Sequence, residues 1–184
     1  MTGKTLAGCT GISILALLAA GPATAGEIEL GIRLGETKAA IDADQLTDGV
    51  GRHDGLMNMA LTGSYRWNTG ALVEIGWSGS AMIFSGTDLG QDWIGAGWQF
   101  APEGNWKITP KAGLTFSHLT ARDNFFSENP RNERNDTVPY AELTVEYKFF
   151  RKLGLGAYTR YNFEDWGSSR STGVMLSWTF LGEK

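Results

Sequence analysis

The residues best suited to catalysis are the two histidines, His53 and His118, because an imidazole can act as a general base towards a nearby hydroxyl. Ser117 is adjacent to His118 in an alternating segment, so the two side chains point to opposite faces of a strand and cannot act together. His53 could be joined by Ser85 or Asp88 only if two separate loops came together. We therefore expect no catalytic site, and we interpret His118 as a rim residue and His53 as a loop residue.

Metal ligands are sparse in the sequence. Asp42, Asp44, Asp48 and Asp54 could attract divalent cations, but they lack the spacing of a calcium-binding loop. The single cysteine, Cys9, lies in the segment LAGC, which resembles a lipoprotein processing site but precedes the apolar run that such a site should follow. We expect neither a metal nor any other cofactor.

Charged residues of both signs recur on one face of segments that alternate apolar and polar residues. The segment AELTVEYKFF at 141–150 has apolar side chains at its odd positions and polar or charged ones at most of its even positions. A strand with this pattern either buries its apolar face in a soluble core or turns that face towards lipid. Along the chain the polar face carries ten charged side chains: Glu29, Arg33, Arg66, Glu74, Lys107, Lys111, Glu142, Glu146, Lys148 and Arg160.

If this charged face lines an enclosed lumen, its residues must form ion pairs, because an isolated buried charge is costly. A turn centred on Arg151 places Glu142 opposite Arg160, since both are equally distant from it in sequence. Arg66 and Glu74 flank the turn NTG (68–70) and are expected to lie near each other. A paired network would close the lumen, and the alternative is a narrow path for ions or small solutes.

Eight segments alternate in this way and predict eight strands. They span residues 27–35, 56–67, 71–78, 92–100, 106–118, 138–150, 153–164 and 172–180. Short connections such as NTG, APEGN and FRK alternate with long ones, which is typical of transmembrane barrels. The sequence therefore predicts an all-β fold, an eight-stranded antiparallel up-and-down transmembrane β-barrel.

Glycines and aromatic residues indicate which face is turned to lipid. The charged face also carries Gly31, Gly35, Gly76, Gly95, Gly97, Gly113, Gly154, Gly156 and Gly173, which would leave room for long charged side chains inside a narrow barrel. Aromatic residues on the apolar face are expected to form two girdles at the membrane interfaces. The girdle at the short turns comprises Trp67, Phe100, Trp106, Phe149 and Phe180, and the girdle at the long loops comprises Trp77, Phe116, Tyr140 and Phe163.

The N-terminal residues have the features of a secretory signal. Lys4 precedes an apolar run at 12–20, and the motif Ala23-x-Ala25 predicts cleavage after Ala25. Without Lys4, the expected mature chain keeps 15 of the 16 basic residues and all 20 acidic ones, so it is a poor candidate for nucleic-acid binding. We expect residues 1–25 to be a signal peptide and residues 26–184 to form one barrel domain, as a monomer.

The last strand, STGVMLSWTF (171–180), ends on an aromatic residue as the terminal strands of outer-membrane barrels do, although four residues follow it. With the strand pattern, this makes the chain similar to the small eight-stranded outer-membrane β-barrel family that includes the OmpX/Ail, OmpA-barrel and opacity-type proteins. The resemblance covers 26–184 and implies insertion in the outer membrane of a Gram-negative bacterium, among outer-membrane lipids and lipopolysaccharide. Barrel enzymes that modify lipid A, an acyltransferase and a deacylase, are less similar, because the lumen expected here is charged.

The long connection at 120–139 is predicted to be the main contact surface, because function in such barrels resides on the loops. Its candidate contact residues are Arg122, Phe125, Phe126, Arg131 and Arg134. They could meet lipopolysaccharide or a host or envelope protein. We expect either a structural role in the envelope or a surface interaction as an adhesin or host-factor-binding protein.

Overall fold

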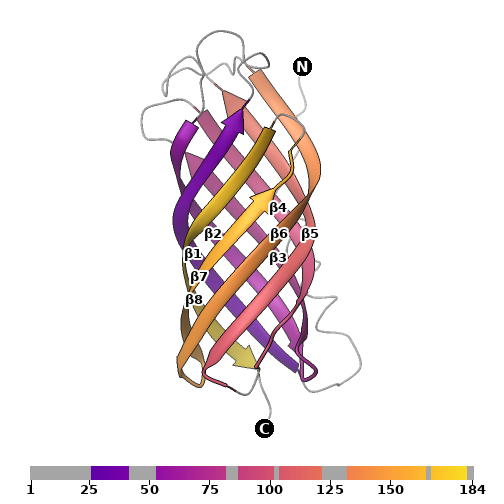
Figure 1. Cartoon of the computed structure of the whole chain (residues 1–184), viewed down its shortest axis with the longest axis vertical. Helices are drawn as coiled ribbons and strands as arrows, with labels where there is room; N and C mark the ends of the chain where they lie inside the picture. The colour runs from indigo at the N-terminus through magenta and orange to yellow at the C-terminus, as the bar shows by residue number, and fades with distance from the viewer. Residues whose placement is uncertain are drawn as a thin grey trace, which may run out of the picture.

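The computed structural model describes residues 26–41, 53–81, 87–101, 104–121, 132–164 and 167–181, and they fold into one closed barrel (Figure 1). Its strands are β1 (Gly26–Ile41), β2 (His53–Trp67), β3 (Ala71–Ala81), β4 (Thr87–Trp98), β5 (Trp106–Ala121), β6 (Asn132–Phe150), β7 (Leu153–Asn162) and β8 (Gly167–Leu181). No helix among the described residues is long and apolar enough to cross a membrane. The predicted eight-stranded antiparallel barrel is confirmed.

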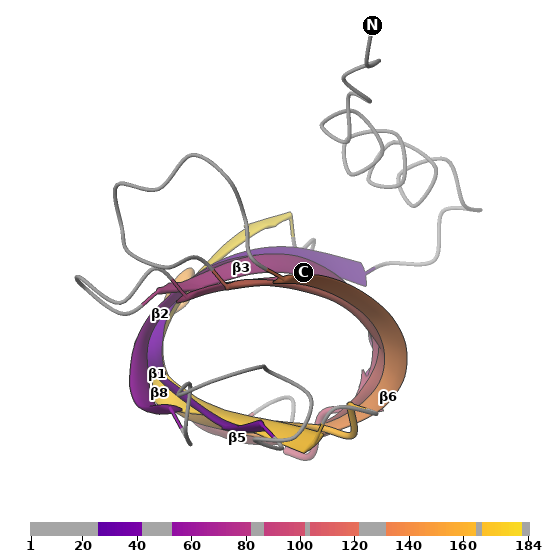
Figure 2. The same ribbon diagram turned by 90° about the horizontal axis from the view of Figure 1, so that it is seen from above.

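Each strand pairs with its neighbours in sequence, and β8 returns to β1 to close the ring (Figure 2). The β1–β8 ladder runs from Ile28 opposite Leu181 to Ile41 opposite Gly167. Closure removes the unpaired strand edges that an open sheet would expose. Every strand therefore has one face towards the interior and one towards the surroundings.

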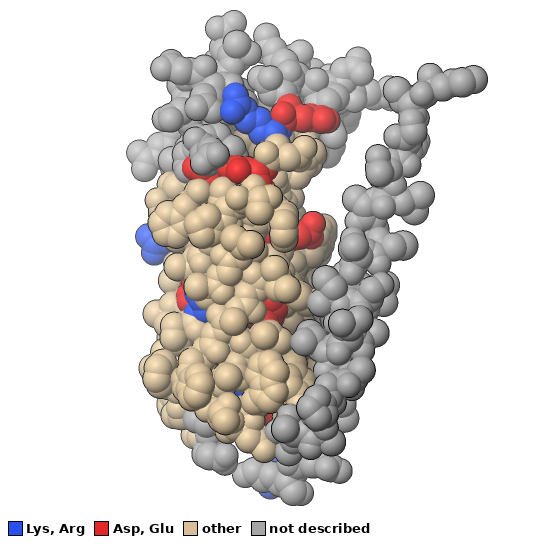
Figure 3. Space-filling model, turned by 90° about the vertical axis from the view of Figure 1, so that its right-hand side faces the viewer, with Lys and Arg blue, Asp and Glu red and all other residues tan. Residues whose placement is uncertain are grey.

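The alternation sends apolar side chains outwards and charged ones inwards. Ile32 and Trp106 are 50% and 62% exposed on the outer face, whereas Arg33 and Glu142 are 1% and 5% exposed on the inner face. A broad and mostly uncharged band covers the face seen in Figure 3, and charged side chains gather towards its upper end. This distribution is the reverse of a soluble core and matches a barrel surrounded by lipid.

Glycines on the inner face make room for the large inward side chains. A Cβ on Gly76 would overlap the Trp93 indole, and a Cβ on Gly95 would overlap the Tyr140 hydroxyl. Gly35 lies opposite Gly173 in the β1–β8 ladder, and a Cβ there would come 2.8 Å from the Gly173 Cα. These positions are glycine because larger residues would collide with side chains or backbone already in place.

Aromatic side chains cluster at both ends of the outer face. At the short-turn end, Trp106 packs on Tyr147 and Trp178 packs on Phe180, with ring centroids 5.0 and 6.1 Å apart. The other aromatic residues expected in the two girdles, Trp77, Phe100, Phe116, Phe149 and Phe163, are exposed, and Trp67 is half-buried. The prediction for Tyr140 is wrong: it shares the inward face of β6 with Glu142 and is 2% exposed.

Most strands are longer at the long-loop end than the sequence predicts. β1 continues to Ile41 instead of ending at 35, β5 continues to Ala121, and β6 begins at Asn132 instead of near 138. Beyond the apolar band both faces of a strand are polar, so the alternation that marks the strand in the sequence fades before the strand ends. β4 differs at both ends: it begins at Thr87, earlier than predicted, and ends at Trp98, and Phe100 forms only an isolated bridge with Ile108.

Substituting an inward glycine should destabilise the barrel far more than substituting an outward one. We expect Gly95→Val to lower the free energy of unfolding by about 1–3 kcal/mol through overpacking. The matched control is Gly90→Val, because a Cβ there meets only the His118 carbonyl oxygen at 3.8 Å; we expect a change of less than about 0.5 kcal/mol. Urea unfolding in detergent micelles, followed by tryptophan fluorescence, measures both, and equal effects would contradict this account of the inner face.

Candidate functional site: the charged lumen and its rim

The middle of the lumen holds two carboxylates, Glu74 on β3 and Glu142 on β6, that share three cationic side chains. Arg33 donates from Nη1 to Glu142 Oε2 at 2.9 Å and from Nη2 to Glu74 Oε2 at 3.0 Å. The Lys111 Nζ lies 2.5 Å from one oxygen of each carboxylate. Arg160 donates from Nε to Glu142 Oε2 at 2.8 Å. These five buried residues, here called the central cluster, form one connected ion-pair network.

Aromatic rings surround the cations of the central cluster. The Arg160 guanidinium carbon lies 3.6 Å from the centroid of the Trp93 ring and 4.5 Å from that of Tyr140. The Arg33 guanidinium carbon lies 5.0 Å from the Tyr158 ring centroid. Trp93 also donates from Nε1 to Glu74 Oε1 at 3.0 Å. The network has three cations for two carboxylates, and the ring faces stabilise the additional positive charge through cation–π interactions.

A second set of charges lies nearer the short turns. The Lys148 Nζ contacts Glu29 Oε2 at 2.7 Å and Glu146 Oε1 at 2.8 Å. Arg66 donates to Glu27 in a half-buried ion pair. Glu74, however, lies opposite Ser64 in the β2–β3 ladder. Arg66 and Glu74 are therefore two residues out of direct register on adjacent strands and line the same cavity, so they lie near each other as expected, but each forms its ion pairs with other residues.

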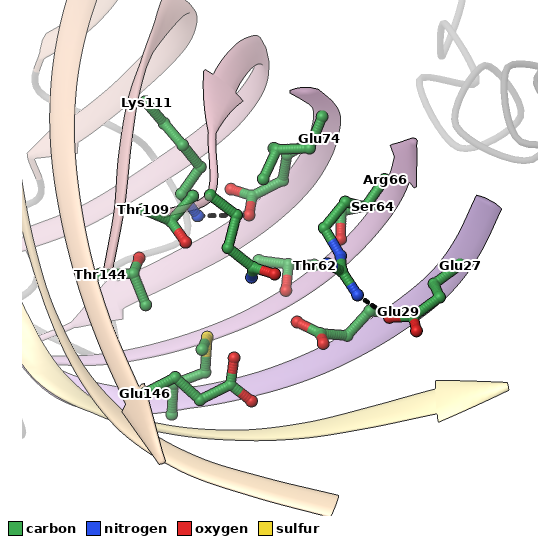
Figure 4. A pocket seen from close by; sticks show the side chains of 13 residues that line it. Glu27, Glu29, Thr62, Ser64, Arg66, Glu74, Thr109, Lys111, Thr144 and Glu146 are labelled. Carbon is green, nitrogen blue, oxygen red and sulfur yellow. Dashed lines mark hydrogen bonds and ion pairs between the residues drawn. The ribbon is translucent and has the colours of Figure 1, made fainter. Parts of the chain in front are cut away.

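A small cavity separates this second set from the central cluster (Figure 4). Glu29, Arg66 and Glu146 line its short-turn side, and Lys111 bonded to Glu74 closes its other side. Gln99 also lines the cavity, and its buried Oε1 has no hydrogen-bond partner among the described residues. The lining residues therefore offer both hydrogen-bond donors and hydrogen-bond acceptors, which suit water or another small polar molecule.

A polar layer centred on Glu164 lies on the long-loop side of the central cluster. The Glu164 carboxylate accepts hydrogen bonds from Gln91 Nε2 at 3.1 Å, Ser169 Oγ at 2.6 Å and the Ser169 backbone N–H at 2.8 Å. Asn162 donates to the same Ser169 hydroxyl at 3.0 Å. Glu164 follows the end of β7, and burial raises the pKa of its carboxyl. Hydrogen bonds satisfy this carboxyl group, and no cation among the described residues forms an ion pair with it.

The structure places the ten predicted lumen residues on the inner face of the barrel. Glu142 lies opposite Arg160 in the β6–β7 ladder, as expected from the turn position. Lys107 is 6% exposed and forms no ion pair with a described residue. The predicted set of lumen charges omitted Glu27 and Glu164, and Trp93 was not expected to take part in it. Strand parity alone could have placed Trp93 inwards, although it could not have identified its partners.

His118 is exposed on the outer face of β5, and Ser117 is buried on the inner face, so the two do not meet. His118 instead contacts Thr120 through Nε2 at 3.1 Å and Asn135 through Nδ1 at 2.5 Å. The Thr120 hydroxyl, the His118 imidazole and the Asn135 amide therefore resemble a nucleophile, a base and a group that orients the base. Thr120 pairs with Asp88 on one side and Glu133 on the other, so the backbone amides of the described strands around it are engaged in the ladders and are not arranged as an oxyanion hole.

The predicted loop contacts fall mostly outside the described residues. Arg122, Phe125, Phe126 and Arg131 lie there, as do the aspartates at 42, 44 and 48, Ser85 and the residues of the predicted signal. Arg134, predicted in the loop, is instead an exposed residue of β6, because that strand begins at Asn132. Among the described residues no group of three His, Cys, Asp or Glu side chains could hold a metal ion.

Comparison with known proteins identifies the fold but no sequence family. No protein-family model and no curated protein matches the sequence. Neisserial surface protein A, NspA, is similar with a TM-score of 0.62 and 11% identity over 84% of this chain and 97% of that one. Ail of Yersinia pestis, in complex with the heparin analogue sucrose octasulfate, has a TM-score of 0.61 and 13% identity over 85% of this chain and 99% of that one. The N-terminal β-barrel domain of OprF from Pseudomonas aeruginosa has a TM-score of 0.57 and 12% identity over 84% of this chain and 99% of that one. The shared feature is the small transmembrane barrel itself.

Neutralising a carboxylate of the central cluster should cost much more stability than neutralising one at the mouth. We expect Glu142→Gln to lower the free energy of unfolding by about 3–5 kcal/mol, because its three cations would then be left with one carboxylate. The matched control, Glu27→Gln, removes a carboxylate whose side chain is 34% exposed, and we expect a loss below about 1 kcal/mol. Urea unfolding at neutral pH measures both. An effect of Glu142→Gln no larger than that of the control would contradict the assigned role of the central cluster.

Proposed function

We propose that this chain is an integral protein of the Gram-negative outer membrane whose lumen is closed, and that it acts through its outer surface and loops. The observation that carries this proposal is the central cluster. Its ion pairs join β1, β3, β5, β6 and β7, and Trp93 adds β4. Side chains from most of the circumference therefore meet within an interior that is already narrow in an eight-stranded barrel.

Opening a continuous path would require these pairs to separate. Arg33 alone bridges both carboxylates, and Lys111 does the same from another strand. Breaking buried ion pairs leaves uncompensated charges and costs several kcal/mol. A closed lumen supports a structural or surface-contact role over transport.

The outer face supports insertion in an outer membrane. A band of exposed apolar side chains lies between two aromatic clusters, as expected for a barrel that crosses a bilayer. The fold is also that of outer-membrane proteins such as NspA and OprF. In this location the predicted signal at 1–25 would direct export, and the long connections would face the cell exterior.

Purified protein in planar lipid bilayers should give no regular single-channel steps, because the central cluster occupies the bore. The measurement is current at applied potentials of either sign, with a general porin as the positive control. Protein in its heat-modifiable, folded form must be used, since misfolded protein disturbs bilayers nonspecifically. Stable steps of uniform size from folded protein would overturn the closed-lumen proposal and favour a channel.

A surface-binding role is the second candidate, and the length of β5 and β6 favours it. Both strands reach the connection at 122–131, far beyond the apolar band, and β6 is 19 residues long. A membrane-crossing strand needs only about 9–11 residues. This extension would hold the connection, with its two phenylalanines and its arginines, clear of the membrane. Ail, a barrel of the same fold, binds a heparin analogue, and adhesion to a host polyanion or protein is the corresponding role here.

Deleting 123–131 and joining the ends with a short glycine linker should separate the two roles, because β5 to Ala121 and β6 from Asn132 stay intact. If the surface role holds, adhesion of expressing cells falls to the level of cells without the protein, while detergent resistance is unchanged. A leaky envelope with normal adhesion would indicate the structural role. Unchanged adhesion and unchanged resistance would contradict a function for this connection.

A further inference from the structure

Two basic side chains lie side by side on the outer face where the barrel closes. Lys38 on β1 is directly opposite Arg170 on β8, and both are exposed. Like charges directly opposite each other in an antiparallel ladder destabilise the pair. An anion that lay between or above the two cations would relieve this repulsion.

Neighbouring side chains neutralise this pair only in part. The Lys38 Nζ lies 3.8 Å from Glu36 Oε1, with side chains 59% and 48% exposed, and such exposed pairs contribute little. Arg170 has no ion pair or hydrogen bond with any described side chain. Among the described residues, no side chain occupies the guanidinium donors, and two parallel donors suit a phosphate.

The height of the pair above the apolar band corresponds to lipid headgroups. The last outward apolar pair of this ladder is Leu34 with Val174, followed by Glu36 with Thr172 and then by Lys38 with Arg170. Moving two residues along a tilted strand corresponds to about 5 Å along the membrane normal. The basic pair is two such steps beyond Leu34 and Val174, so it lies about 10 Å above the band. The headgroup layer extends about 5–8 Å beyond the hydrocarbon, and long basic side chains reach back to it.

An aromatic residue completes the site. Tyr161 on β7 lies opposite Arg170, and its ring packs on Phe163 with centroids 4.7 Å apart. Across the barrel, on β4–β6, Asp88, Thr120 and Glu133 form one row of the ladder. Acidic residues there would repel an anionic headgroup. Among the described residues of the rim, the β8–β1 seam therefore carries the two directly opposed basic side chains that could attract one.

We propose that Lys38 and Arg170, beside Tyr161, bind a phosphate group of lipopolysaccharide, the phosphorylated saccharide lipid of the outer leaflet. This inference rests on the proposed outer-membrane location and assigns it a specific lipid contact. The two cations hold the phosphate, and the tyrosine ring packs against the adjoining sugar.

The test is native mass spectrometry of the detergent-solubilised full-length protein titrated with bisphosphorylated lipid A. The variant is Lys38→Gln with Arg170→Gln. The matched control is Arg151→Gln with Lys152→Gln, which removes two adjacent exposed basic residues from the turn after β6, at the other end of the barrel. We expect the first variant to bind lipid A at least about tenfold more weakly than the parent, and the control to bind it like the parent.

Three further probes identify the ligand chemistry: lipid A stripped of its phosphates, phosphatidylglycerol and inorganic phosphate. Binding of intact lipid A that exceeds all three supports the proposal. Equal binding of dephosphorylated lipid A, or equal competition by phosphatidylglycerol or inorganic phosphate, overturns it, as does an unchanged affinity of the first variant. A heat-modifiable gel shift checks that each variant is folded. A parent protein that does not insert into bilayers at all would defeat the proposed function, whatever the lipid titration gives.

Discussion

The interior depends on the sharing of two buried carboxylates by three cations. Glu74 and Glu142 come from strands that are not neighbours, and Arg33 and Lys111 each contact both of them. A buried charge without a partner would cost several kcal/mol, so the strands that supply these residues must keep their relative positions. The ladder hydrogen bonds join each strand only to its neighbours. The central cluster joins strands across the lumen and makes the barrel one electrostatic unit.

Other features of the interior follow from accommodating that cluster. Trp93 and Tyr140 lie against the Arg160 guanidinium, and both rings need space that a second large side chain would fill. Gly76 and Gly95 supply the space, because a Cβ at either position would overlap one of these rings. Charge pairing, ring contact and missing side chains are thus parts of one packing solution, which differs from the apolar core of a soluble domain.

The outer surface carries the parts of the molecule that can meet partners. Its apolar band and aromatic clusters suit lipid, and the strands continue beyond the band into a polar rim. Charges on this rim are unequally distributed, with Lys38 and Arg170 at the β1–β8 seam and Asp88 and Glu133 near β4–β6. A closed lumen and an uneven rim together direct the proposed function to the surface and its loops.

The sequence by itself determined the number of strands, their antiparallel order and the face that carries the charges. The reason is that period-two alternation is a local pattern, which directly sets the side of the strand on which each side chain lies. It also placed Glu142 opposite Arg160, since a short turn sets the register of adjacent strands. Only the tertiary structure decided that Arg33 reaches Glu142, 109 residues away, and that Arg66 pairs with Glu27 instead of Glu74. These pairings depend on the stagger between strands around the closed barrel, which no local pattern records. The strand ends beyond the membrane band were likewise decided by the fold, because interstrand hydrogen bonds continue where the contrast between apolar and polar residues has ceased.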